Sequence, residues 1–83
     1  MSAAVVAHSH QRISHRVVNA TGCDIGIYVG AGARHVAILH TRVTGANFQG
    51  IFAEKTSHLR ISGSTVTGNA FHTIDPSAPA GSA

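Results

Sequence analysis

The feature that most constrains this chain is an internal repeat with a period of roughly 23 residues. Three pairs of segments share that spacing, and each pair is alike in both sequence and pattern. They are Gly26-Ile27-Tyr28-Val29 with Gly50-Ile51-Phe52-Ala53, His35-Val36-Ala37-Ile38 with His58-Leu59-Arg60-Ile61, and Val43-Thr44-Gly45 with Val66-Thr67-Gly68. A fixed period of this length is typical of repeat proteins, in which each unit buries its apolar face against its neighbours.

Each copy of the repeat consists of short β-strands separated by turn residues. Gly, Ala, Ser, Thr and Asn interrupt the apolar positions too often for helices of typical length. The apolar residues alternate in Val36-x-Ile38 and Leu59-x-Ile61, as a strand with one buried face requires. The pattern predicts an all-β chain in which each copy forms one coil of a parallel solenoid. Successive coils then stack about 4.8 Å apart.

Stacking of the copies predicts ladders of identical or similar side chains. The expected apolar ladders are Ile27-Ile51-Ile74, Val36-Leu59, Ile38-Ile61 and Val43-Val66. A fainter upstream copy extends the alignment by the same offset. It places Ile13 under Val36, Gly22 under Gly45, and Thr21 under Thr44 and Thr67.

The stretch from Gly26 to Asn69 resembles the parallel β-helix repeat of pectate-lyase-like and related secreted bacterial proteins. The resemblance implies a right-handed parallel β-helix, a solenoid with about 23 residues per coil. We expect coils over residues 11–75, preceded by an N-terminal arm over residues 1–10 and followed by a flexible tail over residues 76–83. The family contains lyases, hydrolases, epimerases and adhesins, so membership implies a fold rather than an activity.

The acidic residues favour a non-catalytic interpretation. Pectate lyases, which the chain resembles, hold Ca²⁺ with several acidic residues, and glycoside hydrolysis needs two facing carboxylates. Asp24, Glu54 and Asp75 occupy different phases of the repeat, and only Asp24 falls in register with a polar residue, Asn47. We therefore interpret the chain as a non-catalytic fragment of a secreted carbohydrate-associated protein, acting as a scaffold or weak glycan-binding surface. Asp24 and Asn47 are candidates for a weak contact to a sugar or a cation. The alternative is part of a polysaccharide lyase, hydrolase or epimerase whose catalytic coils lie outside this chain.

Seven histidines are the compositional oddity of the chain. His8, His10 and His15 are close enough in sequence to form a Ni²⁺, Cu²⁺ or Zn²⁺ site, although a solvated arm is the interpretation we favour. His35 and His58 are in register and are expected to stack as a polar pair. Such a pair would share a metal, exchange a proton near pH 6.5, or simply bind the turn backbone. His40 and His72 are expected to join no ladder.

Charge and hydropathy narrow the range of partners. Six Lys and Arg residues against three Asp and Glu residues give a net charge of +3, scattered along the sequence, which disfavours nucleic acid. No segment approaches the roughly 20 apolar residues of a membrane span. No cofactor motif is present, and a single cysteine allows no intrachain disulfide. We expect a polysaccharide partner, or end-to-end self-association through open ends of the stack.

The sequence does not determine the cellular compartment of the protein. The first residues lack the basic region and the apolar stretch of a signal peptide. The family resemblance implies secretion if the natural N-terminus lies upstream.

Overall fold

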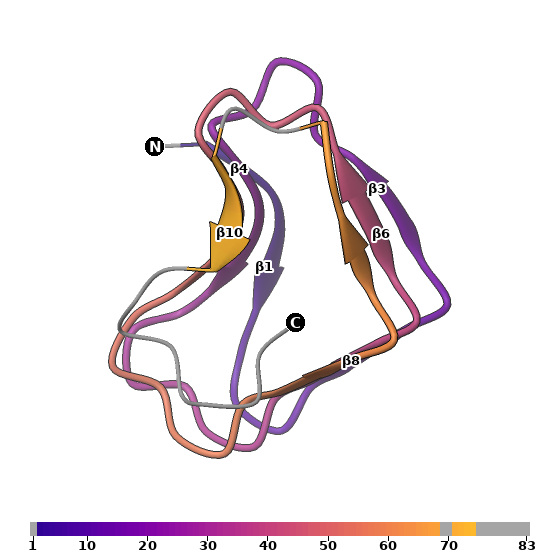
Figure 1. Cartoon of the computed structure of the whole chain (residues 1–83). Coiled ribbons are helices and arrows are strands. Elements are labelled where there is room, and N and C mark those ends of the chain that lie inside the picture. The colour runs from indigo at the N-terminus through magenta and orange to yellow at the C-terminus, as the bar shows by residue number, and fades with distance from the viewer. Residues whose placement is uncertain (1, 69–70, 75–83) are drawn as a thin grey trace.

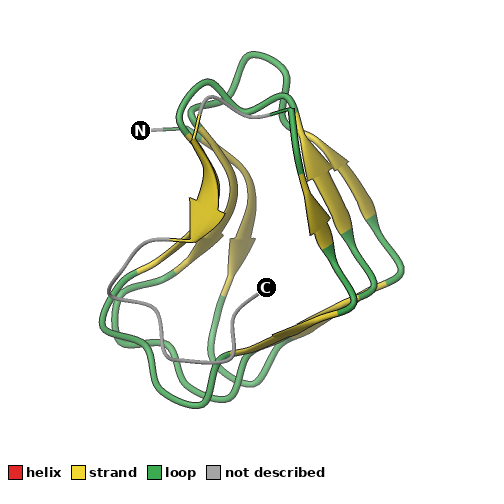
Figure 2. Ribbon diagram, in the orientation of Figure 1, coloured by secondary structure: helices red, strands yellow, loops and turns green. Residues whose placement is uncertain are grey.

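The computed structural model describes residues 2–68 and 71–74, and this part of the chain contains ten β-strands and no helix (Figure 2). The strands form three separate sheets. Sheet A contains β1 (Ala3–Ala7), β4 (Ile25–Val29), β7 (Gln49–Ala53) and β10 (Phe71–Ile74). Sheet B contains β2 (Arg12–Ser14), β5 (Ala37–Leu39) and β8 (Arg60–Ser62). Sheet C contains β3 (Val17–Asn19), β6 (Arg42–Thr44) and β9 (Thr65–Val66).

The chain visits sheets A, B and C in turn and then repeats the same path. We call each passage a circuit: β1 to β3 is the first, β4 to β6 the second and β7 to β9 the third, while β10 returns to sheet A. Each strand pairs in parallel with its equivalents in the neighbouring circuits. Seen along the stack, the three sheets form three sides around a common interior (Figure 1). The all-β, parallel character predicted from the repeat is confirmed.

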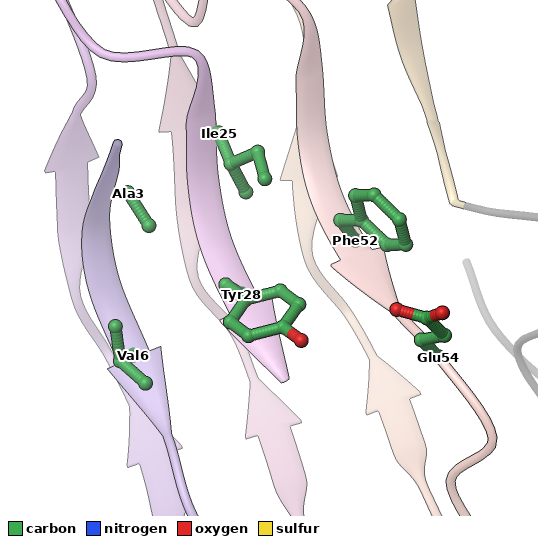
Figure 3. A pocket seen from close by; sticks show the side chains of 6 residues that line it. All are labelled: Ala3, Val6, Ile25, Tyr28, Phe52 and Glu54. Carbon is green, nitrogen blue, oxygen red and sulfur yellow. The ribbon is translucent and has the colours of Figure 1, made fainter. Parts of the chain in front are cut away.

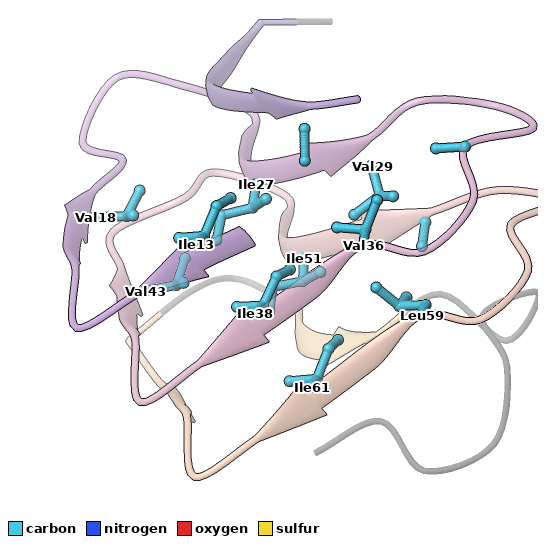
Figure 4. Close-up of a cluster of buried hydrophobic side chains, with 13 residues drawn as sticks. Ile13, Val18, Ile27, Val29, Val36, Ile38, Val43, Ile51, Leu59 and Ile61 are labelled. Carbon is cyan, nitrogen blue, oxygen red and sulfur yellow. The ribbon is translucent and has the colours of Figure 1, made fainter. Parts of the chain in front are cut away.

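The strand pairing that the repeat predicts is present in all three sheets. Ile27, Ile51 and Ile74 are register partners in sheet A, as are Ile38 with Ile61 in sheet B and Val43 with Val66 in sheet C. Of these, Ile27, Ile38, Val43 and Ile51 are fully buried, and they meet across the interior in one cluster (Figure 4). β-Branched residues suit this position, because their stiff side chains fit a pleated, half-buried surface.

The first circuit follows a different offset from the one predicted. Ile13 pairs with Ile38 rather than lying under Val36, and Asn19 rather than Thr21 pairs with Thr44. The cause is the turn between β1 and β2, which is residues 8–11, whereas the equivalent turn between β4 and β5 is residues 30–36. Turns lie outside the ladders and tolerate changes in length, so the predicted offset does not extend upstream.

Thr21 and Gly22 also lie off the predicted ladder. Thr21 donates from its backbone nitrogen and from its hydroxyl to Asn19 Oδ1, at 3.1 and 2.6 Å, within the turn between β3 and β4. These bonds close a local turn of the kind that Asn side chains commonly form. Gly22 therefore belongs to this turn and is not the structural equivalent of Gly45.

The predicted N-terminal arm is wrong for most of its length. Ala3–Ala7 forms strand β1, which pairs with β4 along sheet A. Burial alternates along this apolar strand and Ala7 is completely buried, as expected for a strand with one face against the interior. The predicted tail over residues 76–83 lies outside the described residues.

Candidate functional site

The outer face of sheet A carries an open groove with a volume of about 370 Å³ (Figure 3). Its lining comes from strands β1, β4 and β7 and from the residue that follows β7. The lining residues are Ala3, Val6, Ile25, Tyr28, Phe52 and Glu54. The groove is lined mainly by apolar and aromatic groups with one carboxylate, the composition typical of a small-ligand site.

A bend in the sheet shapes this groove. Sheet A bows toward the interior, so its outer face is concave (Figure 1). At the bend, Gly26 lies so close to its neighbours that an added Cβ would crowd Val43 Cγ1 and stand 2.5 Å from the Gly50 carbonyl oxygen. Only glycine permits this approach. The first glycine of the Gly-Ile-aromatic repeat is therefore the residue that lets the strand bend.

Two aromatic rings form one wall of the groove. Tyr28 and Phe52 are register partners on β4 and β7, and Val6 on β1 continues the same row. The rings meet edge to face, with centroids 5.8 Å apart and planes at 88°. This arrangement is a favoured one for aromatic pairs, and both rings are only partly buried. The groove therefore offers apolar ring surface beside the Glu54 carboxylate.

Two columns of histidines occupy the corners on either side of sheet B. The rings of His10, His35 and His58 stack with centroids 5.3 and 4.4 Å apart and planes within 17°. At the other corner, His15 and His40 stack at 5.1 Å. His35 and His58 lie together as the repeat predicts. The prediction that His40 joins no ladder is wrong, because the first circuit has a longer offset at this corner, the same one that pairs Ser14 with Leu39.

The corner backbone explains why histidine recurs there. All five of these residues have positive φ, between 47° and 65°. Few residues besides glycine accept this conformation, and histidine, like asparagine, is enriched in it. The backbone nitrogens then donate across circuits, as His35 does to the Ser57 carbonyl and His40 to the Ser62 carbonyl. The columns are thus built into the turns rather than into a solvated arm.

Stacking affects protonation at the centre of the first column. Partial desolvation, followed by the charges of His58, His10 and Arg34, lowers the pKa of His35 from its ordinary value. Among the described residues, no group of three or more His, Cys, Asp or Glu side chains is arranged to hold a metal ion. His8, His10 and His15 are accordingly not gathered into one site.

Asp24 and Asn47 are not in register. Ile25 pairs with Gln49, which places Asp24 opposite Phe48, and Phe48 N donates to the Asp24 carbonyl at 2.8 Å. The Asp24 carboxylate instead accepts from the Ser2 backbone nitrogen at 3.3 Å. The offset between β4 and β7 is longer by a single position than the repeat phase used for the prediction. The two side chains therefore do not stand in one row of register partners.

Sequence reasoning missed the groove and the second histidine column. The aromatic residue recurs at the same place in both Gly-Ile-aromatic segments, and that recurrence was the available signal for the groove. Its concavity follows from the Gly26 contacts, which no sequence pattern reveals. His15 and His40 were hidden by the shorter turn of the first circuit.

Comparisons with protein-family models, with curated proteins and with solved structures found no match to this chain. The described part of the chain contains no helix with the length and hydrophobicity needed to cross a membrane. Function is therefore inferred from the geometry of the outer faces of the sheets.

Proposed function

We propose that this chain is a right-handed parallel β-helix module that binds a glycan, without cleaving it, in the groove on sheet A. The parallel pairing and the ordered visits to three sheets support the β-helix interpretation. The strong preference of parallel crossover connections for the right-handed form supports the handedness. The resemblance of Gly26 to Asn69 to repeats of secreted carbohydrate-associated proteins supports the choice of ligand class.

The observation that carries the proposal is the pairing of two rings with a carboxylate in one open groove. The C–H faces of a sugar pack on exposed aromatic surface, which supplies apolar contact with little loss of side-chain freedom. The Glu54 carboxylate accepts hydrogen bonds from sugar hydroxyls. An open groove accepts an internal segment of a long polymer, whereas a closed cavity admits only an end or a small molecule.

The same groove argues against cleavage. Both common routes of glycoside hydrolysis require two carboxylates flanking the bond. Glu54 is the only carboxylate among the described residues that line the groove, and Asp24 is bonded to Ser2 nearby in sheet A. The rival proposal, that the chain is part of a lyase, hydrolase or epimerase, needs catalytic groups from outside the described residues.

The chain contains an internal reporter for the test. Tyr28 is its only tyrosine and there is no tryptophan, so intrinsic fluorescence comes from the groove itself. Titration with a panel of neutral and acidic oligosaccharides is expected to change Tyr28 emission in a saturable way. Phe52→Ala is expected to weaken binding about tenfold, the order of one lost ring contact.

A matched control removes a phenylalanine ring that lies outside the groove. Phe48 is 37% exposed and does not line the groove, so Phe48→Ala is expected to leave affinity within about twofold. Equal loss in Phe52→Ala and Phe48→Ala, or no saturable signal with any glycan, would overturn the proposed site. Release of shortened products from the bound polymer would show that the chain cleaves it, and would favour the alternative that the chain is part of an enzyme.

A further inference from the structure

Two arginines that are far apart in the sequence lie in one row of the folded chain. Arg12 and Arg60 are both exposed on the outer face of sheet B, where they flank Ala37 in one row of register partners. Two strand spacings separate them, which is about 10 Å. Nucleic acid was disfavoured because the charge is scattered along the sequence. In the folded chain these two charges lie on one face.

The two histidine columns border the same face. His10, His35 and His58 stand at the corner where the chain enters sheet B, and His15 and His40 at the corner where it leaves. From His10 to His15 the chain advances five positions, so the face is roughly 16 Å wide. Arg34 and Arg16 are exposed beside these corners. We call this surface the basic face; its members are Arg12, Arg16, Arg34, Arg60, His10, His15, His35, His40 and His58.

The described carboxylates lie elsewhere. Asp24 immediately precedes β4 and Glu54 immediately follows β7, so both lie next to the ends of sheet A strands. Between the charged rows, the outer face of sheet B has small or neutral groups, including Ser14, Leu39 and Ser62. The basic face therefore offers many hydrogen-bond donors and no described carboxylate acceptor.

From this arrangement we infer that the basic face binds the phosphate backbone of a nucleic-acid duplex, independently of its sequence. Phosphate oxygens are acceptors only, and arginine matches them with a planar pair of donors. A flat patch of about 10 by 16 Å is wide enough to contact phosphates of both strands. The described part of the chain has no helix that could enter a groove, so binding is expected to follow the backbone alone.

Three other partners fit the face less well. Single strands are usually held by stacking on aromatic rings, but Tyr28 and Phe52 lie on sheet A. A membrane surface would need protruding apolar anchors, and Leu39 is only partly exposed. An acidic glycan presents hydroxyl donors as well as anions, and these find few acceptors here.

The experiment measures anisotropy of a labelled duplex of about 20 base pairs against the full chain, between about 50 and 200 mM salt. The logarithm of affinity is expected to fall with the logarithm of salt by about 0.9 per phosphate contacted. Arg12→Gln/Arg60→Gln is expected to weaken binding at least tenfold and to reduce the slope by about 2. Both arginines are exposed, so circular dichroism of the variant should match that of the parent.

The control removes the same net charge from other surfaces. Arg42→Gln/Lys55→Gln takes one cation from sheet C and one from the turn between β7 and β8. Its affinity is expected to stay within about threefold of the parent. Equal weakening in the two double variants would show that net charge alone binds the duplex, and would overturn the inference.

Acid should strengthen binding, because protonated imidazoles add donors and charge to the face. The groups that interact with His35 are His10, His58 and Arg34, all of them on this corner. Because the pKa of His35 is lowered, its share of the gain appears only below about pH 6.5, and His35→Asn is expected to reduce the gain there. Absence of duplex binding at about pH 6 and low salt, or tighter binding of a polyuronate or of anionic vesicles, would overturn the assignment. Phe52→Ala distinguishes a polyuronate bound in the groove from one bound on the basic face, because it alters the groove alone.

Discussion

Replacement of Gly26 by alanine tests how the bend of sheet A is held. The added Cβ would stand 2.5 Å from the Gly50 carbonyl oxygen and would also crowd Val43 Cγ1. Real Cβ atoms keep at least 3.0 Å from other heavy atoms, so the Gly50 carbonyl or β4 must shift to make room. Neither can move freely, since β4 is paired on both sides and Val43 is completely buried.

The expected loss of stability follows from two opposing effects. Forcing one methyl group into a packed interior costs about 1–3 kcal/mol. Reduced freedom of the unfolded chain returns about 0.4–1 kcal/mol for any glycine-to-alanine change. The net destabilisation of Gly26→Ala is therefore about 1–2 kcal/mol, and each kcal/mol lowers Tm by about 4–8 °C in a domain of this size.

Two further glycines separate crowding from backbone strain. At Gly30 the nearest atom to a Cβ is the Ala7 carbonyl oxygen at 3.7 Å, so Gly30→Ala should be neutral or stabilising by up to about 1 kcal/mol. At Gly32 a Cβ meets nothing within 4 Å, but φ is +77°, so Gly32→Ala incurs only the left-handed penalty of about 1–2 kcal/mol. Urea unfolding followed by circular dichroism gives all three values. A Gly26→Ala variant as stable as Gly30→Ala would refute the crowding argument.

Two other predictions concern the core and the histidine columns. Ile38→Ala should destabilise the fold by about 2–5 kcal/mol in urea unfolding, because Ile38 is completely buried. Val17→Ala, at a position that is 76% exposed, should change stability by less than about 0.5 kcal/mol, and equal effects of the two substitutions would contradict the assignment of the interior. The pKa of His35 is lowered in the folded state, so the unfolded chain takes up a proton first, and stability should fall as pH drops below about 6.5. His35→Asn keeps the left-handed backbone and should make that loss shallower, measured as urea midpoints between about pH 7.5 and pH 5; an unchanged slope would contradict it.

The repeat predicted the parts of the fold that the core fixes. Ile27 with Ile51 and Val43 with Val66 pair as expected, because each must lie over its equivalent to bury its apolar surface. The first circuit was misaligned because its turn after β1 contains residues 8–11 only, and no buried side chain fixes turn length. The prediction of an arm failed for the related reason that β1 contains small residues, which give a weak pattern.

The sites were harder to predict because they depend on the exact register. Between the second and third circuits, the offset of sheet A differs from that of sheet B by a single position, and this difference moves Asp24 from Asn47 to Phe48. The different length of another turn conceals the stacking of His15 on His40. Outer-face positions carry no apolar pattern that would correct such slips. A period read from the core therefore predicts the core well and the surface poorly.

The two proposed faces differ because the repeat treats inward and outward positions differently. Inward positions must stay apolar in every circuit, as Ile13, Ile38 and Ile61 do in sheet B. Outward positions are free to vary, yet each residue placed there stands one strand spacing from its equivalent in the next circuit. A side chain that recurs at such a position therefore forms a row. The aromatic rings form one beside Glu54 on sheet A, and the imidazoles form another beside the arginines on sheet B. Because separate sheets carry the rows, loss of one face should leave the other intact, and the variants proposed for the groove and for the basic face should act independently.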